Sequence, residues 1–135
     1  MSNERKFAEE ILNLAINKGA DVAEVYIKSS KKLSIEVKNQ KIDALESSLS
    51  FGYSLRVIKE RSLGFSYSTD RDNINSVVDD AVEAASCADK DEYLEMPEAG
   101  SPMSVDIFDP RISAIEEDEA VKKVCILENA AYEVD

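Results

Sequence analysis

The sequence predicts an α+β fold in which an antiparallel sheet of four or five strands, arranged as a meander, carries two helices on one face. Two observations predict it: apolar residues recur every three or four positions near both ends of residues 1–88, and at every second position between them. Because the predicted strands are apolar on one face only, the helices should cover that face and leave the other to solvent.

The first predicted helix spans residues 3–18. Its apolar residues have the spacing of one helix face: Phe7, Ala8, Ile11, Leu12 and Ala15. Gly19 follows as a residue that readily adopts the left-handed conformation found just after many helices. The pattern therefore favours an amphipathic helix that ends at residue 18.

Five segments in the middle of the chain alternate apolar and polar residues, which predicts strands. These segments are residues 22–28, 32–38, 42–50, 53–58 and 63–68. Polar turns are expected between them, at residues 29–31, 39–40 and 59–61. Gly52 predicts a bulge or sharp bend between the third and fourth strands.

The helical spacing returns after Asp70 and predicts a second helix that ends near Ala88. Thr69 and Asp72 have the spacing of a capping pair at its start. This helix completes the predicted N-terminal domain, residues 1–88.

A linker and a C-terminal helix are expected after this domain, over residues 89–135. Residues 89–112 hold all three prolines of the chain and show no periodicity, as is typical of linkers. The last helix is predicted over residues 116–134. Its apolar stripe has no obvious partner among the first 88 residues, so we expect it to pack against chain that is absent here.

The chain carries 28 acidic and 16 basic residues, for a net charge of −12. This charge disfavours direct binding of nucleic acid or of an anionic membrane. The N-terminal residues lack the unbroken apolar core of a signal peptide, and no apolar run approaches the roughly 20 residues that span a bilayer. We therefore expect a cytoplasmic location.

The chain contains no histidine. A His-Glu-x-x-His zinc site, a Ser-His-Asp triad and a Cys-His dyad are therefore excluded within it. Cys87 and Cys125 are expected to be buried free thiols, and a disulfide, a metal pair or a nucleophile is the alternative. No residue is assigned a catalytic or metal-binding role.

Two acidic clusters occur where the second and third helices are expected, and they comprise Asp70, Asp72, Asp79, Asp80 and residues 116–119. Helix capping and solvated helix faces explain both clusters. A site for calcium or magnesium is the alternative.

Arg56 is the candidate substrate-binding residue. It lies in the middle of a predicted strand, on the face opposite Leu55 and Val57, where a guanidinium can bind a carboxylate. The alternative is an exposed arginine paired with a neighbouring acid. Three aromatic residues are expected to be sheet-surface rings or part of a protein interface: Tyr26, Tyr53 and Tyr67.

Several segments, in order along the chain, resemble the TldD/PmbA family of metalloproteases. Residues 18–26 resemble the GA-x-x-AE-V start of these proteins, and residues 52–58 resemble their G-x-x-x-R-V strand. Residues 39–42 are similar to the N-G-x-(I/V) turn, except that Gln40 replaces its glycine. The same likeness extends to residues 63–70, Asp109-Pro110 and residues 128–131.

The resemblance implies the N-terminal, non-catalytic domain of a two-domain zinc metallopeptidase that acts on peptides or unfolded proteins. Zinc and its His-Glu-x-x-x-His motif are expected in a C-terminal domain absent from this chain, so the chain should hold no cofactor and be inactive alone. The implied partners are that missing domain, a peptide substrate, and a second subunit in a homodimer or a TldD–TldE-like heterodimer. The alternative is a stand-alone protein-interaction or regulatory module of the DNA gyrase modulator type.

Overall fold

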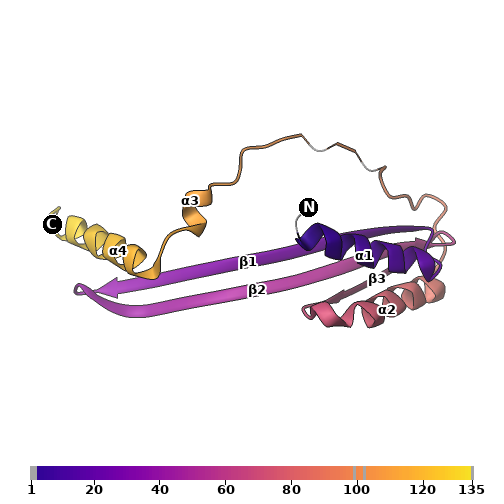
Figure 1. Cartoon of the computed structure of the whole chain (residues 1–135), viewed down its shortest axis with the longest axis horizontal. Coiled ribbons are helices and arrows are strands. Elements are labelled where there is room, and N and C mark those ends of the chain that lie inside the picture. The colour runs from indigo at the N-terminus through magenta and orange to yellow at the C-terminus, as the bar shows by residue number, and fades with distance from the viewer. Residues whose placement is uncertain (1–2, 99, 102, 135) are drawn as a thin grey trace. The chain divides into compact units, whose positions relative to one another are not determined.

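The structure, a computed structural model, describes residues 3–98, 100–101 and 103–134 (Figure 1). The described residues divide into two compact units. Unit 1 falls within Met1–Ser30 and Ser50–Ala99, and unit 2 falls within Lys31–Leu49 and Gly100–Asp135. Each unit is therefore built from two separate stretches of the sequence.

The described residues form an α+β fold with one antiparallel sheet of three strands in the order β1-β2-β3. The strands are β1 (Val22–Lys38), β2 (Lys41–Lys59) and β3 (Ser62–Ser68). The prediction of four or five strands is not confirmed. β1 continues through residues 29–31, where a turn is predicted, and β2 continues through Gly52, where a bend is predicted.

The predicted strand ends are misplaced because they were inferred from polar residues. Strands pair through backbone groups, and this pairing does not require apolar side chains. The hydroxyl groups of Ser30 and Ser50 lie 2.7 Å apart, so Ser30, which suggests a turn in the sequence, instead pairs with β2 from within β1. Every residue of Lys41–Ser50 is exposed. A ribbon exposed in this way has little apolar alternation from which a boundary could be read.

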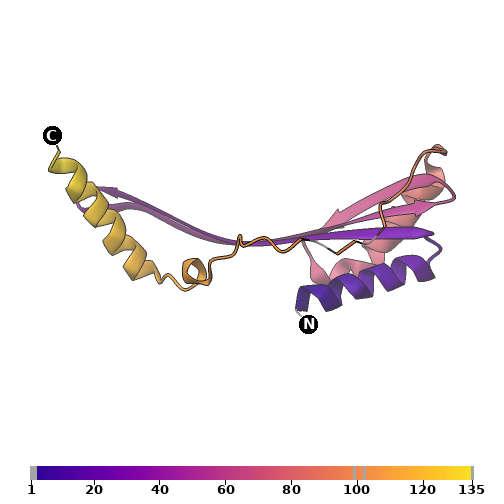
Figure 2. The same cartoon turned by 90° about the horizontal axis from the view of Figure 1, so that it is seen from above.

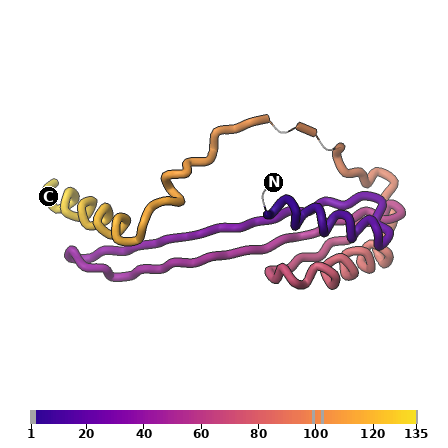
Figure 3. The backbone as a smooth tube through the Cα atoms, viewed as in Figure 1, coloured from indigo at the N-terminus to yellow at the C-terminus, as the bar shows by residue number. Residues whose placement is uncertain are grey.

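Two-residue loops connect the strands, and the tube in Figure 3 shows both reversals of the chain. Asn39 and Gln40 have φ values of 53° and 59°, and Glu60 and Arg61 have values of 49° and 67°. Positive φ at both loop residues is the signature of the type I′ turn that favours β-hairpins. The predicted turn at residues 39–40 is thus confirmed, although Gln40 adopts a conformation that usually selects glycine.

Helices α1 (Asn3–Asn17) and α2 (Ile74–Cys87) cover the same face of the sheet in unit 1 (Figure 2). Their apolar faces, the inward residues of β2 and Ala20 from the α1–β1 connection form one core, which comprises Phe7, Ile11, Ala15, Ala20, Tyr53, Leu55, Val57, Val77, Val78, Ala81 and Ala85. A fully buried leucine, isoleucine or valine contributes about 1.5–3 kcal/mol. The predicted packing of both helices on one sheet face is confirmed.

Asp70, rather than the predicted Thr69, caps the start of the second helical segment. Its carboxylate accepts a hydrogen bond of 2.9 Å from the backbone N–H of Asp72, at the start of the short helix η1 (Arg71–Asn73) that precedes α2. Either side chain is chemically suited to this position.

A short helix, α3 (Pro110–Ser113), lies in the stretch predicted as a linker without structure. Asp109 accepts a hydrogen bond from the backbone N–H of Arg111, and the Arg111 guanidinium binds both carboxylate oxygens of Asp109 at 2.8–3.1 Å. This contact lowers the pKa of Asp109 below its usual value. Pro110 occupies the first position of α3, where proline is common. Asp109 and Pro110 together therefore mark the start of this helix.

The last helix, α4 (Glu117–Tyr132), contacts the β1–β2 hairpin loop within unit 2. The Glu128 carboxylate accepts hydrogen bonds from the backbone N–H groups of Asn39, at 2.9 Å, and Gln40, at 2.7 Å. The Gln40 amide donates to the carbonyl oxygen of Cys125 at 3.2 Å. These polar contacts join α4 to the hairpin loop, and the expectation that its apolar stripe packs against absent chain stays a prediction.

Candidate interaction face around Arg56

Arg56 lies on the sheet face of unit 1 that the helices leave uncovered. Its neighbours Leu55 and Val57 are fully buried on the opposite face, as the alternation predicts. The guanidinium forms an ion pair of 2.5 Å with Glu24 of β1, and both side chains are about half exposed. Arg56 is therefore both accessible and already paired with a carboxylate.

Aromatic residues surround this ion pair on the uncovered face. Phe65 of β3 lies directly opposite Arg56 in the strand register, and Tyr67 lies opposite Ser54. The two rings are 6.2 Å apart, and their residues are 55% and 73% exposed. Tyr26 on β1 is also exposed, so the face combines a guanidinium with several accessible rings.

Tyr53 differs from the other two predicted surface tyrosines, because it is 3% exposed and packs in the core. Its ring meets Phe7 edge-on at 5.1 Å. Burial raises the pKa of the phenol, the nearby charge of Asp70 raises it further, and the Ser68 hydroxyl opposes both effects. Tyr53 therefore contributes to the fold rather than to the uncovered face.

The outer side of β3 borders this face. In the part of the chain that the structure describes, β3 is at one edge of the sheet and pairs only with β2. Its sequence contains no proline or lysine, residues that commonly protect edge strands from pairing. Its backbone N–H and C=O groups are thus arranged to accept another extended chain.

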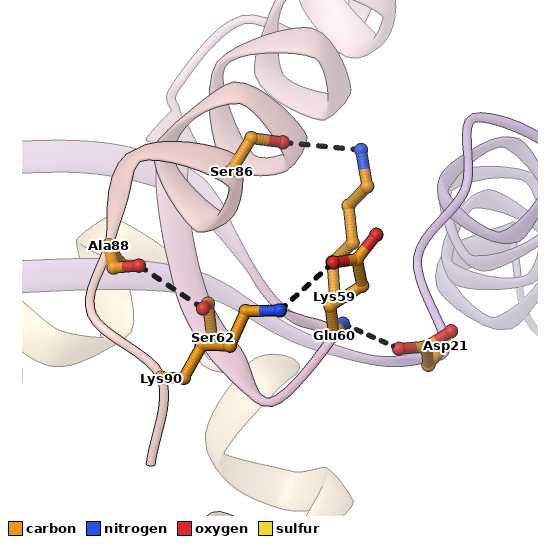
Figure 4. Close-up of polar contacts among 7 residues, drawn as sticks. All are labelled: Asp21, Lys59, Glu60, Ser62, Ser86, Ala88 and Lys90. Carbon is orange, nitrogen blue, oxygen red and sulfur yellow. Dashed lines mark hydrogen bonds and ion pairs between the residues drawn. The ribbon is translucent and has the colours of Figure 1, made fainter.

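The β2–β3 hairpin end is held in place by polar contacts (Figure 4). Asp21 accepts a hydrogen bond of 2.7 Å from the backbone N–H of Glu60, and Lys90 pairs with the Glu60 side chain at 3.1 Å. Lys59 donates to the Ser86 hydroxyl in the last turn of α2. Since that turn has no basic residue of its own, this lysine supplies positive charge at the negative end of the helix.

The predicted burial of both cysteines is wrong for Cys87, which is exposed, whereas Cys125 is partly buried. Both thiols are free. Cys87 ends α2 on its outer side, a position that the helical pattern alone does not distinguish from a buried one.

In both acidic clusters, the residues whose contacts are resolved cap a helix or contact a lysine. Asp70 caps η1, Asp79 pairs with Lys18 at 2.6 Å, and the nearby Lys123 lowers the pKa of Glu119. Among the residues that the structure describes, no group of three His, Cys, Asp or Glu side chains could hold a metal ion.

Comparison with protein families gives a match between residues 23–85 and domain 1 of the PmbA/TldA metallopeptidases. Residues 23–85 are therefore assigned to the first, N-terminal domain of the TldD/PmbA family. The matched residues include Glu24, Arg56 and Phe65, so the uncovered face lies within the family's first domain. No curated protein matches the sequence significantly.

Solved structures share the fold. TldE from Thermococcus kodakarensis superposes with a TM-score of 0.75 and 19% sequence identity, over 96% of this chain and 30% of that protein. A candidate modulator of DNA gyrase from Bacteroides thetaiotaomicron gives a TM-score of 0.71, with 20% identity over 90% of this chain and 29% of that one. A similar candidate from Thermotoga maritima gives 0.62, with 16% identity over 87% and 26%. The chain described here thus spans less than a third of the length of these proteins.

None of the helices that the structure describes is both long and apolar enough to cross a membrane. Sequence reasoning placed Arg56 on the uncovered face but missed Glu128 and Arg71. Both act through contacts with residues far away in the sequence, and no local motif marks such contacts.

Proposed function

We propose that this chain is the N-terminal, non-catalytic part of a TldD/PmbA-like zinc metallopeptidase that acts on peptides or unfolded proteins. One observation supports this proposal most strongly. The superposition on TldE covers 96% of this chain but only 30% of the TldE chain. In this proposal, zinc and its ligands belong to a part of the protein outside this sequence, because the sequence itself has no histidine.

Unit 2 supports a role in assembly because it exposes apolar side chains on both of its parts. The β1–β2 hairpin exposes Ile42, Leu45 and Leu49, and α4 exposes Ile126 and Leu127. Exposed apolar side chains commonly mark contacts that another protein covers. We assign these contacts to the catalytic domain or to a second subunit, in a homodimer or a TldD–TldE-like heterodimer.

Unit 1 supports a role in substrate access through the edge of β3 and the adjacent uncovered face. An extended peptide can pair with an edge strand through its backbone, which makes recognition tolerant of sequence. Phe65 and Tyr67 then offer rings to alternate side chains of the peptide, and Arg56 offers a guanidinium to a carboxylate.

Reading the coding sequence beyond Asp135 tests this proposal. We expect several hundred further residues that include a His-Glu-x-x-x-His motif. We also expect residues 1–135 alone to bind no stoichiometric zinc and to cleave no peptide. A stop codon directly after Asp135 would contradict the proposal.

A second candidate function is a stand-alone interaction module that regulates another protein. The two solved structures described as candidate modulators of DNA gyrase favour it. A net charge of −12 suits a basic protein surface better than DNA. Supercoiling assays with purified gyrase separate the two functions, because only the module should change the rate when added as residues 1–135.

A further inference from the structure

A groove of about 680 Å³ runs between α1 and the η1–α2 segment of unit 1, on the opposite side of the sheet from the Arg56 face. Its apolar lining consists of Phe7, Leu14 and Ile74. Its polar lining combines one cation, two acids and three amides, namely Arg71, Glu10, Asp72, Asn13, Asn17 and Asn75. No residue of this groove belongs to the face assigned above to substrate access.

Arg71 is the preorganised group in this groove. Its guanidinium carbon lies 4.0 Å from the ring centre of Phe51 and 4.9 Å from that of Phe7, so two aromatic rings contact the cation and help to position it. Its nearest carboxylate is that of Glu4, at 3.8 Å, which is beyond hydrogen-bonding distance. Within the described residues, the Arg71 guanidinium therefore has stacking partners but no resolved hydrogen-bond acceptor.

A guanidinium with unfilled donors selects a carboxylate, which it can bind through two parallel hydrogen bonds. The remaining lining suits a peptide rather than a simple anion. Asparagine amides both donate and accept hydrogen bonds, and the carboxylates of Glu10 and Asp72 accept them from peptide N–H groups. The same two acids repel a small anion that has no N–H groups to offer.

We propose that this groove binds the C-terminal end of a peptide, with the terminal carboxylate on Arg71 and the preceding peptide groups along the asparagines. Glu4 occupies the approach to Arg71 as an intramolecular competitor. This site is independent of the peptidase assignment, because it uses none of the residues of the Arg56 face and no metal.

Nuclear magnetic resonance of the ¹⁵N-labelled chain tests the proposal, with acetyl-trialanine as the probe and its C-terminal amide as the matched control. We expect the free acid to shift the Arg71 Nε–H signal and the backbone amides of residues 10–17 and 71–75, with a Kd of about 1 mM. The amidated peptide should bind at least about tenfold more weakly, since it lacks the charge that Arg71 recognises. Acetate and phosphate should also bind more weakly than the peptide acid.

Three variants sharpen the test. Arg71→Gln should raise the Kd at least about tenfold, Glu4→Gln should lower it about two- to threefold, and Arg61→Gln in the distant hairpin loop should leave it unchanged. Equal binding of the acid and the amide, or unchanged binding by a folded Arg71→Gln chain, would overturn the proposal. Acetate binding as tight as that of the peptide would also overturn it, because the groove would then recognise a simple anion rather than a peptide. If Arg71→Gln does not fold, the acid–amide comparison in the unmodified chain still decides.

Discussion

Gly64 of β3 lies directly beneath the backbone of Ala81 in α2. A Cβ atom built on Gly64 would overlap the Ala81 carbonyl oxygen and come within 2.7 Å of the backbone nitrogen of Ala85. The absence of a side chain at residue 64 therefore sets how closely the helix approaches the sheet.

Substitution Gly64→Ala should destabilise unit 1, because the new methyl group meets rigid backbone rather than a movable side chain. We expect a loss of about 1–3 kcal/mol in the free energy of unfolding, measured by urea titration. Gly52→Ala in β2 is the matched control, since its new Cβ would make only ordinary contacts, at 3.8 Å or more. Equal effects of the two substitutions would show that α2 does not pack on β3 as described.

Removal of the Glu128 carboxylate should release α4 from the β1–β2 hairpin loop. In Glu128→Gln, we expect amide hydrogen exchange at Asn39 and Gln40 to accelerate about fivefold, which corresponds to a loss of about 1 kcal/mol. Glu133→Gln, near the end of the same helix, serves as the control. Unchanged exchange in Glu128→Gln would contradict the contact.

The buried phenol of Tyr53 should make unfolding depend on alkaline pH. Because its pKa is raised in the folded chain, its stabilising contribution is complete below pH 10 and is lost as the pH rises through the raised value. We expect the free energy of unfolding to fall above pH 10 more steeply for the unmodified chain than for Tyr53→Phe. Parallel pH profiles of the two proteins would rule this out.

At neutral pH, Tyr53→Phe should cost little stability. Among the described residues, the buried hydroxyl has no hydrogen-bond partner of good geometry, so its removal leaves no new unpaired group. We expect the free energy of unfolding, measured by urea titration, to change by less than about 1 kcal/mol.

Arg56→Gln should weaken substrate binding in the product of the whole reading frame. We expect a KM for an unfolded-protein substrate about tenfold higher, with kcat changed less than about twofold, if Arg56 binds the substrate carboxylate. Stability should change by less than about 1 kcal/mol, because the ion pair with Glu24 is half exposed. An unchanged KM would leave Arg56 with the role of a surface ion-pair partner.

The sequence was informative wherever one face of an element is buried. The apolar stripe through Phe7, Ile11 and Ala15 placed α1, and the alternation around Leu55 and Val57 placed Arg56 on the uncovered face. The same reasoning predicted too many strands between residues 28 and 50, because exposed strands do not need alternating side chains.

Contacts between distant residues were beyond sequence reasoning. The stacking of Arg71 on Phe7 and Phe51 joins three elements, and the hydrogen bonds of Glu128 go to backbone groups that every residue possesses. Neither contact depends on a spacing or a residue type that would distinguish it from an ordinary surface charge.

The central proposal is that catalysis requires a zinc-binding part of the protein that lies outside this sequence. The most direct measurement compares zinc content and peptidase activity between the product of the whole reading frame and residues 1–135 alone. We predict zinc-dependent cleavage of an unfolded protein by the whole product, with neither stoichiometric zinc nor cleavage for residues 1–135. Tight zinc binding together with peptidase activity in residues 1–135 would contradict the claim.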